Sequence, residues 1–156
     1  MQSQADTQTA YEKAIQLLLD CSTPYGFIAA KNKTTNGNYD RIWARDSMIC
    51  TLAALTTDNP QLILTAKRSL QTLLKYQHEQ GEIVSNVDPR TDSVSFGGTA
   101  GRVDSNLWFL IGFGQYVKRT ADINFAKRHF AKFRKTIHLV RIHEFNHKGL
   151  IYVPMT

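Results

Sequence analysis

The tract Asn38–Asp46, which reads NYDRIWARD, carries the residue types best suited to chemistry in this sequence. It combines two aromatic rings, two arginines and two carboxylates. Aromatic faces stack against the C–H side of a pyranose, and charged Asp and Arg side chains give directional hydrogen bonds to its hydroxyl groups. The tract therefore fits sugar recognition. A structural interpretation fits equally well, in which Asp46 or Ser47 caps a helix, Trp43 lies in the core and Arg45 pairs with a nearby acid.

A second tract, Gly97–Trp108, repeats part of this composition after a glycine-rich approach. Arg102, Asp104 and Trp108 again surround the start of a predicted helix. A glycine-rich loop before a helix can hold phosphate, but GGTAGRVDS matches neither a Walker A loop nor a dinucleotide fingerprint, and no clear strand precedes it. Asp104 as a helix N-cap is the structural alternative, and it is compatible with a binding role.

Histidines and cysteines give no comparable signal. His138, His143 and His147 are spaced by five and four residues, but the sequence has no HExxH motif, and the helix is predicted to end near them. No GxSxG motif is present, and neither Cys21 nor Cys50 stands in a motif that marks a nucleophile. We therefore expect no metal, no cofactor, and two reduced thiols in a cytoplasmic protein.

Basic residues are concentrated in one segment. The formal net charge is +6. Residues 118–148 hold nine Lys or Arg and two acids, a net charge of +7, so the rest of the chain has a net charge of −1. A basic helix can bind nucleic acid, but a solvated outer face is the more common cause, and we prefer it here. No run of about 18 apolar residues predicts a membrane span. Residues 1–20 lack the basic start and cleavage site of a signal peptide.

Apolar spacing predicts an all-α chain that forms a single domain. Five helices are expected, at about Thr7–Asp20, Ser47–Thr57, Gln61–Glu79, Ser105–Thr120 and Asp122–Phe145. The third opens at Asn59-Pro60, a good start signal. Short strands are expected at about Glu82–Ser85 and Leu150–Val153, and the first six residues are expected to be mobile.

The predicted helices alternate in character. The third and fifth are amphipathic, with one apolar side and basic residues elsewhere. In the fifth, the apolar stripe is Ile123, Ala126, Phe130, Phe133, Ile137 and Val140. The second reads SMICTLAALTT and the fourth SNLWFLIGFGQYV, without a charged face. Because helices that are apolar all round are buried on all sides, the even helices are expected to be inner and the odd ones outer.

Loop lengths follow the same alternation. The connections that lead into the inner helices are long, at about Cys21–Asp46 and Gln80–Asp104, whereas those that leave them are short. Loops longer than about 12–15 residues are uncommon and usually functional or disordered. Both long loops would lie at one end, where the inner helices begin. This layout predicts helical hairpins with a working face at that end.

The two tracts together resemble the six-hairpin glycosidases, which include glucoamylases, amylo-α-1,6-glucosidases and the neutral/alkaline invertases. NYDRIWARDSMICTLAAL resembles the start of their second helix, and RVDSNLWFLIGFGQYVKRTAD resembles the fourth helix of the invertases. The resemblance covers about residues 25–125. It implies an (α/α)6 toroid, of which this chain would supply the N-terminal part, about five of twelve helices.

The resemblance implies that Trp43, Arg45 and Asp46 contact the sugar in the cleavage subsite and that Asp104 lines the same pocket. The candidate sugar-binding residues are Tyr39, Arg41, Trp43, Arg45, Asp46, Arg102, Asp104 and Trp108. In the resembled families the general acid follows the fifth helix and the base comes much later, so both catalytic groups are expected beyond Thr156. An adjacent Arg favours an ionised carboxyl group, whereas a general acid must hold its proton; we therefore assign Asp46 and Asp104 to binding.

The leading hypothesis is a glycoside hydrolase that acts on α-glucosides or sucrose-like sugars. We expect it to invert the configuration at the anomeric carbon, and we expect this chain to be inactive alone. One alternative is a non-catalytic helical module that binds carbohydrate or protein, and another is a nucleic-acid binder that uses Lys118–Lys148. An inverting hydrolase needs an acid and a base about 6.5–9.5 Å apart. The two inner helices would have open apolar sides, so we expect that the isolated chain is marginally stable, associates with itself, or is a fragment of a longer gene product.

Overall fold

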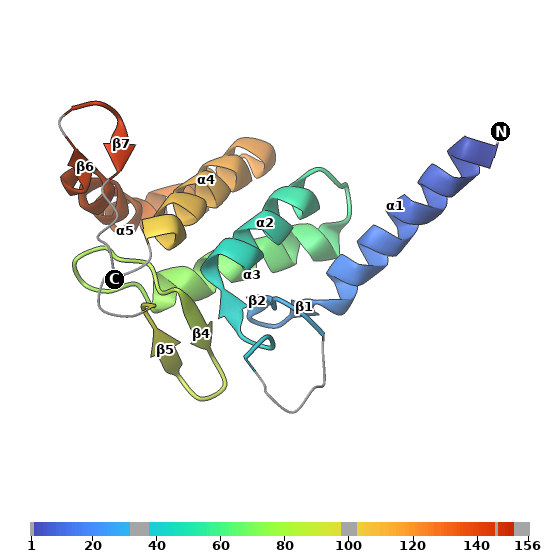
Figure 1. The fold of residues 1–156 in the computed structure, drawn as a ribbon, viewed down its shortest axis with the longest axis horizontal. Helices are drawn as coiled ribbons and strands as arrows, with labels where there is room; N and C mark the ends of the chain where they lie inside the picture. Colours follow the sequence, from blue (N-terminus) through green and yellow to red (C-terminus); the bar gives the residue numbers. More distant parts are fainter. Residues whose placement is uncertain (1, 32–37, 98–102, 146, 152–156) are drawn as a thin grey trace.

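The computed structural model describes residues 2–31, 38–97, 103–145 and 147–151. These residues form an all-α structure with three small antiparallel sheets (Figure 1), as expected. The helices are α1 (Gln2–Asp20), α2 (Ala44–Leu55), α3 (Pro60–Lys75), α4 (Val103–Thr120) and α5 (Ile123–Ile142). The strands are β1 (Ser22–Thr23), β2 (Gly26–Phe27), β3 (Ile42–Trp43), β4 (Asn86–Asp88), β5 (Ser93–Ser95), β6 (Glu144–Phe145) and β7 (Leu150–Ile151).

Helices α2 and α4 pack directly against each other at the centre of the fold (Figure 1). Gly112 of α4 permits this close approach, because a Cβ atom there would lie 2.3 Å from the Sδ atom of Met48 on α2. Met48 and the neighbouring Phe109 are both fully buried. The close contact fixes the starts of the two helices relative to each other, and both candidate tracts lie at those starts.

Helix α3 packs against both central helices, and α5 covers α4. The α5 contact is aromatic, with the ring centroids of Phe113 and Phe133 4.7 Å apart. Asp122 caps α5 by accepting a hydrogen bond from the Phe125 N–H group, and it also pairs with Lys67 of α3 at 2.6 Å. The hydrogen bond from Lys67 holds the pKa of Asp122 below its ordinary value. One carboxylate thus joins α3 to the start of α5.

Helix α1 projects away from the remaining helices (Figure 1). Only its last part packs, with Ile15, Leu18 and Leu19 against a small cluster around the buried Phe27. Tyr11 and Leu17 are more than half exposed. No helix in the described ranges is both long enough and apolar enough to cross a membrane.

The two long connections meet in one sheet, which confirms the expectation that they lie at one end. Strand β3 comes from the first connection and pairs with β4 of the second, with Trp43 opposite Asn86. The segment before β4 is tied to both central helices. The Ala44 N–H group donates to the Ser85 carbonyl at 2.9 Å, and the Ile83 N–H group donates to Asn106 Oδ1 at 2.8 Å.

Several predicted boundaries are wrong. Helix α1 includes residues 2–6, and α3 ends at Lys75 rather than near residue 79. Residues 82–85 are not a strand, because the Ile83 N–H group and the Ser85 carbonyl make the contacts just described and the strand begins at Asn86. The strand expected at Leu150–Val153 is seen as β7, and residues 152 and 153 lie outside the described ranges.

The predicted capping residues of α2 are also wrong. This helix begins at Ala44, so its N-cap is Trp43, and both Asp46 and Ser47 lie within it. Strand β3 runs directly into the helix, which leaves no turn for a capping aspartate or serine. Asp104 is not a cap either, because α4 already includes Val103, and Asp104 lies in its first turn.

The exposed faces differ from expectation in two places. Ile123 and Phe130 of α5 are 52% and 58% exposed, because the buried side of the helix is centred on Phe125 and Thr136 instead. The central helices are not buried all round, since Ile49 of α2 is 46% exposed and Ile111 of α4 is 47% exposed. The two central helices therefore each leave an apolar side chain open to solvent.

The close approach at Gly112 gives a matched pair of stability tests. Gly112→Ala is expected to lower the free energy of unfolding by about 1–2 kcal/mol, because overpacking against Met48 outweighs the gain in helix propensity. Gly114→Ala meets no atom within 4 Å and is expected to raise it by up to about 1 kcal/mol. Urea unfolding followed by circular dichroism measures both. Equal effects from the two substitutions would contradict close packing of α2 on α4.

Candidate functional site

A shallow recess lies where α2, α4 and the segment before β4 meet. Its lining residues are Trp43, Arg45, Asp46, Ser85, Asp104 and Ser105. Four of these belong to the candidate set from the two tracts. Residues separated by about 60 positions in the chain therefore line one recess.

An ion pair joins the two tracts across the recess. Arg45 donates from Nη1 to Asp104 Oδ2 at 2.6 Å, so α2 and α4 are bridged at their first turns. Both side chains are more than a third exposed, which limits the contribution of the pair to stability to at most about 1 kcal/mol. The pair is thus accessible to a ligand, and its groups can exchange partners at small cost.

Asp46 lies beside this pair with free hydrogen-bonding capacity. It lines the recess, and it has no hydrogen-bond or ion-pair partner within the part of the chain that the structure describes. A carboxylate has two oxygens that accept hydrogen bonds but donate none. The recess therefore offers an unpaired acceptor, Asp46, next to a charged donor, Arg45. This combination suits neighbouring hydroxyl groups.

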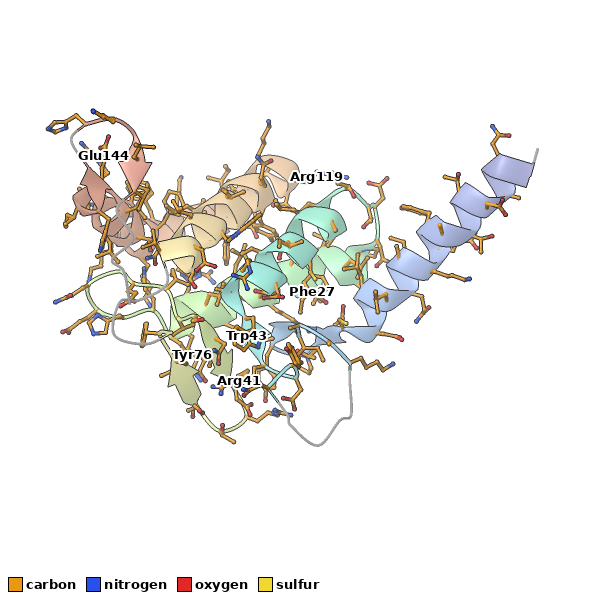
Figure 2. All side chains as sticks on the ribbon, viewed as in Figure 1. Phe27, Arg41, Trp43, Tyr76, Arg119 and Glu144 are labelled. Atoms are coloured by element: carbon orange, nitrogen blue, oxygen red, sulfur yellow. The ribbon has the colours of Figure 1, made fainter. Side chains whose placement is uncertain are left out.

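Trp43 is held in place by its own ring nitrogen. Its Nε1–H group donates to the Asn38 carbonyl at 2.7 Å, and the half-buried ring lines the recess (Figure 2). Trp108 lies one turn after Asp104 on α4 and is also half-buried, packed against the main core. It does not line the recess. Of the two indole rings, Trp43 is therefore placed to contact a ligand.

The remaining candidates lie outside the recess. Arg41 donates from Nη2 to the Ser93 carbonyl at 2.7 Å, so its side chain supports strand β5. Tyr39 is 61% exposed and lines neither the recess nor its rim. Arg102 lies outside the described residues.

An ion-pair network holds the strand that carries Trp43. Arg90, in the turn between β4 and β5, donates to Asp40 at 2.9 Å and to Asp88 at 2.8 Å. Hydrogen bonds from Arg90 hold the pKa of Asp88 below its ordinary value. The second connection is thereby pinned to the first immediately before β3, which sets the position of Trp43.

Asn86 and two serines were missed by the sequence reasoning. Ser85 and Ser105 line the recess. Asn86 lies opposite Trp43 in the sheet and is only 6% exposed, and its Oδ1 atom accepts no hydrogen bond from a described residue. Asparagine is unusual inside a strand, so its place in the apolar run Ile83–Val87 was a usable signal. We add Asn86 to the candidates that could face a ligand.

No set of three His, Cys, Asp or Glu side chains is grouped for a metal ion in the described ranges. Cys21 and Cys50 are both free thiols, and burial raises the pKa of Cys50 to about 11. At neutral pH this thiol is therefore protonated and a poor nucleophile. The chemistry of the recess comes from hydrogen-bonding and aromatic groups.

Comparison with known protein families identifies the family of this chain. The family described as alkaline and neutral invertase matches residues 7–156. This chain belongs to the alkaline and neutral invertase family. Among the three families that the tracts resemble, the comparisons support the invertases and not the glucoamylases or amylo-α-1,6-glucosidases.

A curated relative in the alkaline and neutral invertase family is the probable alkaline/neutral invertase A, chloroplastic, of Arabidopsis thaliana. It is 30% identical to this chain over 146 residues, which cover 75% of the chain and 23% of the relative. The chain thus spans less than a quarter of that relative's length. No solved structure matches this invertase-family chain.

The accessibility of the Arg45–Asp104 pair can be tested through stability. Asp104→Asn is expected to lower the free energy of unfolding by less than about 1 kcal/mol, because the pair is solvated. Asn106→Ala, two residues later on α4, is expected to cost about 1–3 kcal/mol, because it leaves the buried Ile83 N–H group without its acceptor. Urea unfolding of both variants makes the comparison. A cost above 2 kcal/mol for Asp104→Asn would identify the pair as structural.

Proposed function

We propose that this chain supplies one wall of the sugar-binding subsite of a glycoside hydrolase that acts on sucrose-like sugars. The observation that carries the proposal is the Arg45–Asp104 ion pair, which brings both tracts into one recess with Asp46 and Trp43 beside it. Family membership supports the reaction class, and the relative from Arabidopsis thaliana is named as a probable alkaline/neutral invertase.

Each group in the recess has a distinct task in this proposal. The Trp43 ring stacks on the apolar face of a sugar ring, while Asp46 accepts hydrogen bonds from its hydroxyl groups. Arg45 and Asp104 hold each other and offer one donor and one acceptor at the rim. The recess encloses no space that would hold even a water molecule, whereas enclosing ligand sites typically measure about 300–1,000 Å³. The recess is therefore one wall, and further walls complete the subsite.

The catalytic acid and base belong to other walls in this proposal. Asp104 is paired with Arg45, so in this proposal it contributes to substrate binding. The relative is more than four times longer than the part this chain matches, which leaves ample length for both catalytic groups. We further propose that the whole enzyme folds as an (α/α)6 toroid. It would hydrolyse its substrate with inversion of configuration at the anomeric carbon. The open sides of α2 and α4, at Ile49 and Ile111, would pack against later helices or a second copy.

Sucrose binding to the chain tests the subsite. Trp43→Ala and Asp46→Asn are each expected to weaken binding about tenfold or more, because a stacking face or a hydroxyl acceptor is lost. The affinity is measured by NMR titration in low and in high salt. The salt should leave the affinity unchanged, because sucrose is uncharged and releases no counterions.

Tyr11→Ala and Asp6→Asn on the exposed part of α1 are the matched controls, and they should leave the affinity unchanged. Circular dichroism checks that each variant keeps its helices. Unchanged sucrose affinity in both folded recess variants would overturn the assignment of the subsite.

A further inference from the structure

A second, larger pocket lies on the other side of the same strand. It has a volume of about 240 Å³ and lies between the β1–β2 turn, strand β3 and the β4–β5 turn. This volume is slightly below the roughly 300–1,000 Å³ that is typical of small-molecule sites, so the pocket suits a ligand no larger than a single ring, whereas the recess encloses no such space. The short strands that surround the pocket lie below the helices in Figure 1.

Strand β3 separates the pocket from the recess. Ile42 lines the pocket and Trp43 lines the recess, in keeping with the alternation of successive strand side chains between the two faces. Asp40 lines the pocket with Ile42, two residues away. The tract Asn38–Asp46 therefore serves two cavities, and the pocket is separate from the subsite proposed above.

The pocket is lined by apolar residues and by one charged pair. The apolar lining residues include Pro24, Tyr25, Ile28 and Ile42, and Tyr25 is 42% exposed. The Tyr25 backbone is held in place, because its carbonyl accepts a hydrogen bond from Thr72 Oγ1 at 2.6 Å. An aromatic ring is thus presented at the pocket from a fixed turn.

The rim is Asp40 and Arg90. Arg90 donates to Asp40 and Asp88 through Nε and Nη2, while its Nη1 group makes no hydrogen bond to a described residue. Asp40 and Arg90 carry opposite charges, so the rim has no net charge and favours neither an anionic nor a cationic ligand. The rim still provides a free donor at Nη1 beside carboxylate acceptors. Neighbouring hydroxyl groups on an uncharged molecule match that arrangement.

We propose that this pocket binds a neutral monosaccharide ring, with its apolar face against Tyr25 and its hydroxyl groups at Asp40 and Arg90. The ligand class follows from the aromatic wall, the donor–acceptor rim and the volume. Ligand bound there contacts Asp40 and Ile42, immediately before Trp43. The pocket is therefore an accessory sugar site that is connected to the recess through one strand.

NMR titration of the chain with D-glucose and D-fructose tests the proposal. Backbone N–H signals of Tyr25, Asp40 and Arg90 are expected to shift together, with one midpoint concentration. Tyr25→Ala should weaken this binding about five- to tenfold, and Tyr11→Ala on α1 should leave it unchanged. Ile28→Trp should weaken it too, by filling the pocket.

Asp46→Asn separates the pocket from the recess. It should leave the titration of Tyr25, Asp40 and Arg90 unchanged, so failure of one site and failure of the other are distinguishable. The proposal is overturned if these signals do not shift with either sugar. It is equally overturned if the apolar probe p-cresol shifts them and the sugars do not, or if folded Tyr25→Ala binds sugar as tightly as the unchanged chain.

Discussion

The contact between Gly112 and Met48 is the constraint on which the rest of the structure depends. It lets α2 and α4 approach closely enough to place the first turns of both helices side by side. Arg119 secures the opposite end of the same pair, because it donates to the Leu55 carbonyl at the end of α2 and pairs with Asp58 (Figure 2). The two helices are thus fixed relative to each other at both ends.

The site that results is charged at its surface and rigid beneath. Buried hydrogen bonds to Ser85 and Asn106 position the backbone under the recess, while Arg45 and Asp104 remain more than a third exposed. Stability and binding are therefore carried by different residues. Such a division allows ligand groups to compete for the ion pair without loosening the helices.

The sequence was sufficient to predict that the helices exist and to single out the two tracts, because both depend on local patterns. Helix α3 could be placed because Asn59-Pro60 marks its start and its leucines share one face. The buried side of α5 could not be predicted, because Phe125 and Phe130 are equally apolar. Only packing against α4 determines that Phe125 is buried and Phe130 is exposed. Apolar periodicity leaves that choice to tertiary packing.

The candidate site was predictable in composition and not in its contacts. An acid partner for Arg45 was anticipated, but Asp104 lies 59 residues away and only the α2–α4 packing brings it near. The strands β3, β4 and β5 contain two or three residues each, which is too short for alternation to reveal them. Asn86 and the pocket behind β3 depend on that sheet, and neither could be predicted without it.

The central claim is that α2 and α4 together form one sugar-binding wall. The most direct test follows the backbone N–H signals of Asp46 on α2 and Ser105 on α4 by NMR while sucrose is added. A shared site predicts that both signals shift with the same midpoint concentration. Shifts confined to one helix, or two clearly different midpoints, would contradict the claim.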